Sequence, residues 1–251
     1  MASNGPVLDE AIRSADIPPG SAAGTAVLPV EGLDAILFDF DGVLVDSVDI
    51  KSRVFCALFA DHPDHLDAIT ALHERHGGLS RLVKFDMIYR DILKVPLTED
   101  HRVRLARHFA DLVVEQVIAC PMIAGAEAVL RALAPRLPLE VVSGTPEPEL
   151  REIIARRGLT SYFHGIHGSP RGKAEIIGDL LARFGWRARR VVMVGDALTD
   201  HEAAMAHGLP FIGRVPAGQA SPFPPGTRLV ETLTELAPAL TSLYVTDGPT
   251  P

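Results

Sequence analysis

The sequence has only two cysteines and no long apolar run. Cys56 and Cys120 lie in apolar surroundings and have no metal-binding spacing. A disulfide between them stays open, but two buried thiols in a reducing compartment are the interpretation we favour. No apolar stretch approaches the roughly 20 residues that a membrane span needs, and no basic segment precedes an apolar one at the N-terminus. We therefore expect a cytoplasmic protein that contacts no membrane.

Positive charge is also scarce. The 251 residues include 24 Lys and Arg against 32 Asp and Glu, which leaves a net charge of −8. This balance argues against a nucleic-acid binder, which usually carries a basic patch or stripe. An acidic enzyme that acts on anionic substrates must gather positive charge locally or take it from a metal ion. With 47% hydrophobic residues, the chain is otherwise an ordinary globular one, long enough for a core domain plus a smaller one.

Both ends of the sequence differ from its middle. Residues 1–31 are rich in Gly, Ala, Pro and Ser, which predicts a disordered tail with at most a short helix around Leu8–Ile12. A remnant of an expression tag is the alternative interpretation of this segment. Residues 246–251 are predicted to be equally unstructured.

The middle of the chain begins with one strand and continues into helices. The apolar run over 34–39 predicts a buried strand, and residues 48–119 then carry apolar side chains at the 3.6-residue spacing of helices. We expect four helices there, interrupted at Asp61-His62-Pro63, His76-Gly77-Gly78 and Val95-Pro96.

From residue 121 onward, helices and strands alternate. Helices are predicted over 124–134, 147–157, 172–184, 199–206 and 231–243, and strands over 138–143, 163–167, 190–195 and 209–213. Such alternation produces right-handed βαβ units, so we predict an α/β fold with a doubly wound parallel sheet. The core then consists of 32–47 and 121–245, and 48–120 is an inserted, all-helical domain.

Four groups of polar residues fall at strand ends or helix starts, and the first is a carboxylate pair. Asp39 and Asp41 stand one residue apart where the first strand ends, which is where active sites form in open α/β sheets. A carboxylate pair beside Gly42 suits a nucleophile and a general acid near a divalent cation. Such pairs are common, so the meaning of this one depends on its partners.

The other three groups each have an ordinary alternative. Ser143-Gly144-Thr145 offers a hydroxyl and free N–H groups for an oxyanion, although a helix N-cap explains them as well. Lys173 opens a helix, where a cation is disfavoured, and such a misfit is expected at functional sites; a solvated lysine is the alternative. Asp196 and Asp200 follow the fourth strand, and an N-cap role accounts for one of them but not for both.

Together the four groups match what phosphoryl transfer to a carboxylate requires. They supply a nucleophile, an acid or base, oxygen ligands for Mg²⁺ and counter-charges for the phosphoryl oxygens. The order Asp39-x-Asp41-Gly42, Ser143, Lys173 and Gly195-Asp196-x-x-x-Asp200 resembles the four motifs of the haloacid dehalogenase-like hydrolase superfamily, over about residues 34–213. The helical insertion after the first motif resembles the C1-type cap of that superfamily.

This resemblance implies a role for each catalytic residue. Asp39 is expected to attack phosphorus and form an aspartyl-phosphate, and Asp41 to protonate the leaving group and then activate water. Ser143, together with the N–H of Gly144 and the neighbouring Thr145, is expected to hold the phosphoryl group. Lys173 is expected to neutralise charge between nucleophile and phosphate.

The resemblance also implies a Mg²⁺ site. Its expected ligands are Asp39, the backbone carbonyl of Asp41, and Asp196, while Asp200 binds the ion directly or through water. Asp41 narrows the chemistry further, because dehalogenase and phosphonatase relatives, which protonate no alkoxide, lack an acid there. Its presence favours phosphate esters.

Two cap positions bear on the substrate. C1-capped phosphomutases and many related sugar phosphatases carry a histidine twelve residues after the nucleophile, where this chain has Lys51. The departure disfavours a mutase and places a second cation near the substrate, unless Lys51 is a helix-surface lysine. The loop from His76 to Arg81 resembles the specificity loop of C1 caps. Arg81 is therefore a candidate to bind a hydroxyl or second anion, with Lys84 one helical turn later; a solvated arginine is the alternative.

We therefore expect a Mg²⁺-dependent phosphatase for a small phosphomonoester: a phosphosugar, a phosphoglycolate-like acid or a nucleotide. A helical cap that closes over the site excludes bulk water. A sugar phosphomutase is the alternative, and a catalytically silent binding module is disfavoured by the intact acids. The expected oligomeric state is a monomer or a homodimer, with no nucleic-acid partner.

Overall fold

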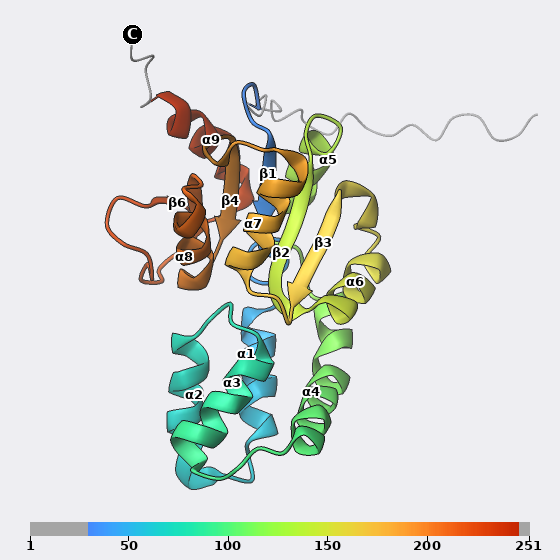
Figure 1. Cartoon of the computed structure of the whole chain (residues 1–251), viewed down its shortest axis with the longest axis vertical. Coiled ribbons are helices and arrows are strands. Elements are labelled where there is room, and N and C mark those ends of the chain that lie inside the picture. The colour runs from blue at the N-terminus through green and yellow to red at the C-terminus, as the bar shows by residue number, and fades with distance from the viewer. Residues whose placement is uncertain (1–29, 246–251) are drawn as a thin grey trace, which may run out of the picture.

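A six-stranded sheet, in which all strands are parallel, forms the centre of the larger part of the molecule (Figure 1). The computed structural model describes residues 30–245, so the predictions for 1–29 and 246–251 lie outside the described residues. The strands follow the order β3-β2-β1-β4-β5-β6. They are β1 Ala35–Phe38, β2 Leu139–Pro146, β3 Gly165–Ser169, β4 Val191–Gly195, β5 Phe211–Arg214 and β6 Arg228–Val230.

Helices cover both faces of this sheet because the central strands are apolar on both sides. Every residue of β1 is buried, as expected of a parallel strand with helices above and below it. Ile36 and Phe38 belong to one core, which continues into α5, α6 and α9, whereas Ala35 and Leu37 belong to another with α7 and α8. The predicted doubly wound α/β fold is confirmed. These helices are α5 Ala126–Leu133, α6 Glu147–Arg156, α7 Lys173–Phe184, α8 Leu198–His207 and α9 Leu236–Val245.

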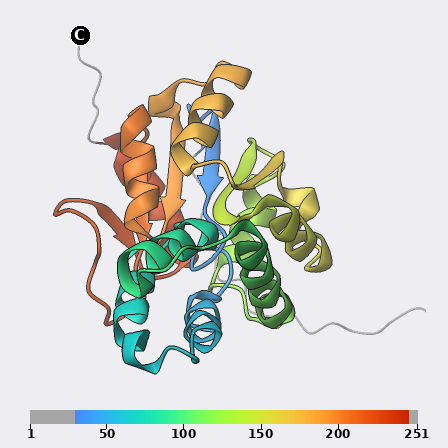
Figure 2. The ribbon, with the colours of Figure 1, turned by 60° about the horizontal axis from the view of Figure 1, so that its bottom comes forward.

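Residues 48–119, from the first helix after β1 to the last helix before α5, form a separate helical unit, called the cap below. Figure 1 places it at the end of the sheet toward which the strand arrows point, and Figure 2 brings it forward. Aromatic side chains make its core, with the ring centroid of Phe55 5.5 Å from that of Phe59 and 5.7 Å from that of Phe85. Its helices are α1 Val48–Leu58, α2 Leu66–Arg75, α3 Arg81–Met87, which continues as a π-helical turn over Ile88–Leu93, and α4 Glu99–Ala119.

The structure differs from the predicted elements in several details, of which β6, β3 and the last helix are examples. Strand β6 was not predicted, because it has three residues at the sheet edge and only Val230 is buried, which leaves no periodic pattern to read. Strand β3 begins at Gly165, two residues later than predicted, where it pairs with Glu140 of β2. The last helix begins at Leu236 because a 3-10 turn occupies Leu233–Glu235. Within residues 30–245, no helix combines the length and apolar character that crossing a membrane requires.

The chain passes from core to cap before α1 and returns after α4, and Arg157 stabilises the return. It lies at the C-terminal end of α6, and its Nη1 donates to the carbonyls of Val117, Ile118 and Cys120 at 2.7, 2.7 and 2.8 Å. The last carbonyls of a helix have no partner within the helix, so α4 ends on a donor that the core supplies. The return of the chain from cap to core is therefore anchored by one side chain.

Replacing this side chain tests the anchor. We expect Arg157→Leu to lower the free energy of unfolding by about 1–3 kcal/mol, because three carbonyls lose a charged donor. Urea denaturation measures the change. Arg156→Leu is the matched control, since Arg156 pairs with Glu115 and Glu152 at the exposed surface and such pairs contribute little. Equal losses in the two variants would contradict the anchoring role.

Candidate active site

The candidate site lies between β1 and β4, where the order in which strands are added to the sheet reverses. β1 and β4 are neighbours, β2 and β3 lie on one side of them, and β5 and β6 lie on the other. In open α/β sheets, ligands bind in the crevice at the carboxyl ends of two such strands. Asp39 directly follows β1, Asp196 directly follows β4, and Asp200 lies in the first turn of α8. Three of the predicted acids therefore meet at the centre of the sheet.

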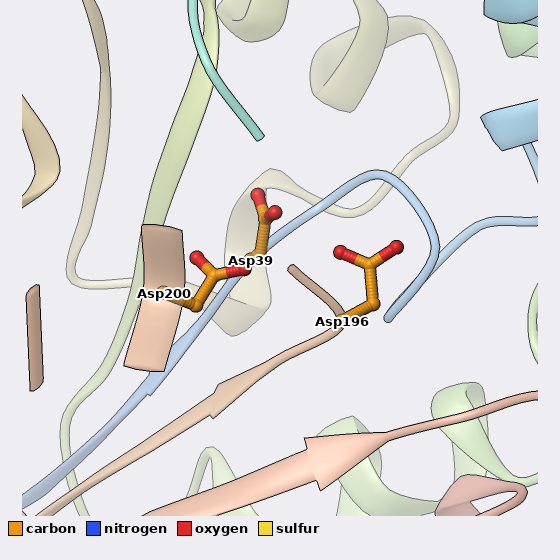
Figure 3. A group of neighbouring side chains, drawn as sticks. All are labelled: Asp39, Asp196 and Asp200. Carbon is orange, nitrogen blue, oxygen red and sulfur yellow. The ribbon is translucent and has the colours of Figure 1, made fainter. Parts of the chain in front are cut away.

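These three acids form one group. A carboxylate oxygen from each lies within 4.8 Å of the other two, and Figure 3 shows Asp39 next to Asp200, with Asp196 on the other side. Burial raises the pKa of Asp39 to about 7; Lys173 opposes this rise, and the neighbouring Asp200 adds to it. Burial and the charges of Asp39 and Asp200 also raise the pKa of Asp196 well above its ordinary value. The group is therefore short of positive charge.

Lys173 is the only side-chain cation that directly contacts this group among the described residues. Its Nζ donates to Asp39 Oδ2 at 2.8 Å and to Asp200 Oδ1 at 2.5 Å. Burial alone would lower the pKa of Lys173, but Asp200 and Asp39 raise it above its usual value, so the lysine stays charged. These partners explain a lysine at the start of α7, where the helix dipole disfavours it. Asp200 Oδ2 also accepts the N–H of Ala197, which fixes its carboxylate.

Asp196 leaves room for a metal ion. Among residues 30–245 its carboxylate has no hydrogen-bond or ion-pair partner, although it faces two other acids. Gly42 borders it with φ +72°, and a Cβ at that position would overlap Asp196 Oδ2. An all-oxygen donor set with excess negative charge fits a hard divalent cation such as Mg²⁺. The residues present therefore suit the expected metal.

The side chain of Asp41 lies outside the acidic group and faces the cap. It accepts hydrogen bonds from Ser47 Oγ at 2.6 Å, from Thr145 Oγ1 at 2.9 Å and from Lys51 Nζ. Burial alone would raise the pKa of Asp41, but Lys51 and the two hydroxyls together lower it. Ser47 was not predicted, because its position before α1 reads as an N-cap; its hydroxyl caps nothing and is used by Asp41.

The segment Ser143-Gly144-Thr145 at the end of β2, called the cradle below, is joined to Asp41 by hydrogen bonds. Ser143 is 1% exposed, and its Oγ accepts the N–H of Thr145 at 3.2 Å. Thr145 Oγ1 in turn accepts from Lys51 Nζ at 2.7 Å, so Lys51 contacts both Asp41 and the cradle. Gly144 packs against the backbone of the cap at Gly78, where a Cβ would overlap the Gly78 carbonyl.

Arg81, a candidate for substrate binding, has a carboxylate partner in the core. Its two Nη atoms donate to the carboxylate of Glu149 on α6, and its guanidinium lies 4.8 Å from the ring centroid of Phe109. Both ion-pair partners are about nine-tenths buried. Arg81 thus joins cap to core, and the sequence could not show this because Glu149 lies far along the chain. Thr199 adds a second contact of this kind, since its Oγ1 donates to the Gly77 carbonyl.

A cavity of about 710 Å³ separates cap from core at this site. It is lined on the core side by Asp39, Asp41, Ser143, Gly144, Thr145 and Asp196, and on the cap side by Lys51, His73, Arg81 and Lys84 among others. Lys84 was singled out by its position one helical turn after Arg81, whereas His73 has no distinguishing sequence signal, since a histidine on a helix is most often solvated. Their approach to the cavity follows from the packing of α2 against α3.

Known proteins with related sequences belong to one hydrolase family or are similar to it in part. The family model of haloacid dehalogenase-like hydrolases matches residues 33–208. The phosphoglycolate phosphatase of Synechococcus elongatus is 30% identical over 180 residues, covering 70% of this chain and 81% of that protein. The tyrosine-protein kinase PtkA of Mycobacterium tuberculosis is 26% identical over 187 residues, which cover 72% of this chain but only 62% of the kinase.

The fold is found in solved structures as well. A crystal structure of CbbY from Rhodobacter sphaeroides in complex with xylulose-(1,5)bisphosphate superposes with a TM-score of 0.67 at 20% identity, covering 83% of this chain and 99% of CbbY. At this identity the likeness concerns the fold. The family match covers more than half of the chain and includes the acids at the ends of β1 and β4. The chain therefore belongs to the haloacid dehalogenase-like hydrolases.

Proposed function

We propose that this hydrolase removes the phosphoryl group from a small phosphomonoester, with Asp39 as the nucleophile and Mg²⁺ as the cofactor. The observation that carries the proposal is the pairing of Asp39 with Lys173 inside the acidic group, while Asp41 stands apart with its own donors. On this basis we assign the attack to Asp39 and the proton transfer to Asp41. The phosphoglycolate phosphatases among the relatives support this reaction class.

In the first half of the proposed reaction, a carboxylate oxygen of Asp39 forms a bond to phosphorus. The bond from phosphorus to the leaving oxygen breaks, and that oxygen takes a proton from Asp41. The hydroxyl of Ser143 and the N–H of Gly144 hold the phosphoryl oxygens. Asp39, the backbone carbonyl of Asp41 and Asp196 would hold Mg²⁺, with Asp200 bound directly or through water, and the bound ion would supply positive charge to the phosphoryl oxygens.

In the second half, Asp41 acts as a base. It takes a proton from a water molecule whose oxygen bonds to phosphorus, and the bond between phosphorus and Asp39 breaks. Inorganic phosphate leaves and the nucleophile is restored. The donors around Asp41 favour its ionised form, which this half of the reaction requires, and they act against the protonated form that the first half requires. Lys51 contributes most to that preference.

A phosphomutase would use the same phospho-enzyme without releasing phosphate. The position that carries histidine in mutases holds Lys51, whose ammonium is committed to Asp41 and Thr145. We expect the enzyme incubated with glucose 1-phosphate to release inorganic phosphate, with little glucose 6-phosphate formed. Parallel assays of phosphate and of the isomer measure the ratio. A majority of isomer would replace the proposed hydrolase by a mutase.

The nucleophile is tested by Asp39→Asn. We expect phosphate release to fall by about 10³-fold or more, because an amide oxygen does not form the acyl-phosphate. Mass spectrometry of acid-quenched enzyme should detect a phosphoryl group on the peptide that contains residue 39 in the wild type and not in the variant.

The matched control is Asp49→Asn, which neutralises an exposed acid that lines the same cavity. It should retain activity close to that of the wild type. Circular dichroism shows whether both variants keep the fold. An Asp39→Asn enzyme within about tenfold of wild-type activity would exclude this residue as nucleophile.

The metal site is tested by Gly42→Ala. The new methyl group would overlap Asp196, so we expect Mg²⁺ affinity to fall by about tenfold or more, measured by isothermal titration calorimetry. Turnover by the wild type should cease in EDTA and return with added Mg²⁺.

Gly158→Ala separates the metal effect from backbone strain. Gly158 has φ +70°, close to that of Gly42, but nothing lies within 4 Å of a Cβ there. Both variants should lose about 1–2 kcal/mol of stability from the left-handed backbone. Only Gly42→Ala should lose the metal; similar Mg²⁺ affinities in the two variants would refute the role of Gly42.

A further inference from the structure

Lys84 is a buried cation without a counter-ion. It lies on α3, is 4% exposed, and has no carboxylate partner among residues 30–245. Its Nζ donates to the carbonyl of His73 at 3.1 Å and lies 3.4 Å from His73 Nδ1 and 5.8 Å from the ring centroid of Phe55. Removing an ammonium group from water without a paired anion is costly, and such groups are rare in folded proteins.

Two other cations on the cap side of the cavity are paired with carboxylates, and a third, Arg75, is exposed to solvent. Lys51 is paired with Asp41, and Arg81 with Glu149. His73 carries no charge at neutral pH, because burial and the charges of Lys84 and Lys51 lower its pKa to about 3. Burial and Lys51 lower the pKa of Lys84 to about 8, so Lys84 remains mostly protonated at neutral pH. Among the described residues that line the cavity, Lys84 is therefore the buried cation without a carboxylate partner.

The position of Lys84 relates it to the leaving group. Lys84 lines the same cavity as Asp39 and Asp41. Lys51 relates Lys84 to Asp41, since it contacts Asp41 directly and is close enough to Lys84 for its charge to lower the pKa of Lys84. The proposed proton transfer places the leaving oxygen at Asp41, so the part of the substrate beyond that oxygen extends toward Lys51 and Lys84.

We propose that Lys84 binds a second anionic group on the leaving-group side of the substrate. The preferred substrates are then phosphomonoesters whose alcohol carries a carboxylate or a second phosphate, and neutral alcohols are poor leaving groups for this enzyme. Carboxylate and phosphate oxygens share the chemistry that an ammonium recognises, namely charge-assisted hydrogen bonds. This inference rests on the proposed phosphatase function, and Lys84 acts in it as a specificity-determining residue.

Matched pairs of substrates test the preference. We compare 2-phosphoglycolate with 2-hydroxyethyl phosphate, 3-phosphoglycerate with glycerol 3-phosphate, and fructose 1,6-bisphosphate with fructose 6-phosphate. In at least one pair the wild type should favour the anionic member by about tenfold or more in kcat/KM, which is the size of one charge-assisted hydrogen bond. A preference in the first two pairs indicates a carboxylate, and one in the third indicates a second phosphate.

Lys84→Met removes the charge and keeps most of the side-chain volume. The variant should lose the preference for the anionic member and keep its kcat/KM for the neutral member within about threefold. Lys94→Met is the control: Lys94 is also a cap lysine but is exposed and distant from the cavity lining, so the preference should persist. Thermal unfolding should show that Lys84→Met is folded. If its preference equals that of the wild type, Lys84 does not select the substrate.

Binding of inert analogues makes the test independent of turnover. With Mg²⁺ present, calorimetry compares 3-phosphonopropionate, which has a carboxylate, with propylphosphonate, which does not, and methylenediphosphonate with methylphosphonate. Tighter binding of a doubly anionic analogue to the wild type, lost in Lys84→Met, supports the anion site even if no phosphoester is hydrolysed. Binding of this kind without any hydrolysis would refute the proposed phosphatase function and leave the anion site supported. Equal affinities within both pairs would overturn the anion site, whatever the catalytic activity.

Discussion

The structure of the site depends on one buried ion pair network, in which Lys173 bridges Asp39 and Asp200. Three carboxylates within 4.8 Å of one another repel strongly in a buried environment, and a single ammonium placed between two of them offsets part of that repulsion. The network also ties α7 and α8 to the end of β1. Removing one buried partner would leave an uncompensated charge, so a substitution in this network should cost more stability than the loss of a surface ion pair.

The parts of the fold that local sequence determines were predictable. β1 and β4 are continuous apolar runs, and in a parallel sheet their carboxyl ends must lie at the same edge. The presence of Asp39 and Asp196 at one edge therefore follows from two strand assignments, whereas their close approach depends on the strand order, in which β1 and β4 are neighbours. In contrast, β6 pairs through three residues at an edge, and its backbone partners rather than its side chains make it a strand.

Side-chain partners that depend on packing between cap and core could not be predicted. Arg81 was a candidate to bind substrate, and the structure gives it Glu149 as its partner because α3 packs near the start of α6. Lys84 has an ordinary helical sequence context, so its burial follows only from the way α2 and α3 meet. Motifs at strand ends thus predict the reacting groups, whereas the surroundings of the substrate require the tertiary structure.

The distribution of charge has a consequence for how a substrate arrives. The chain carries a net charge of −8, while Lys51 and Lys84 line one cavity and Lys173 is buried next to Asp39 in its wall. At physiological ionic strength, charges act in solution over only about 8 Å. A phosphorylated anion is therefore repelled weakly at long range and attracted only after it enters the cavity. Added salt should weaken the long-range repulsion more than it weakens the buried contacts. The rate of substrate association is therefore limited by entry into the cavity rather than set by electrostatic steering.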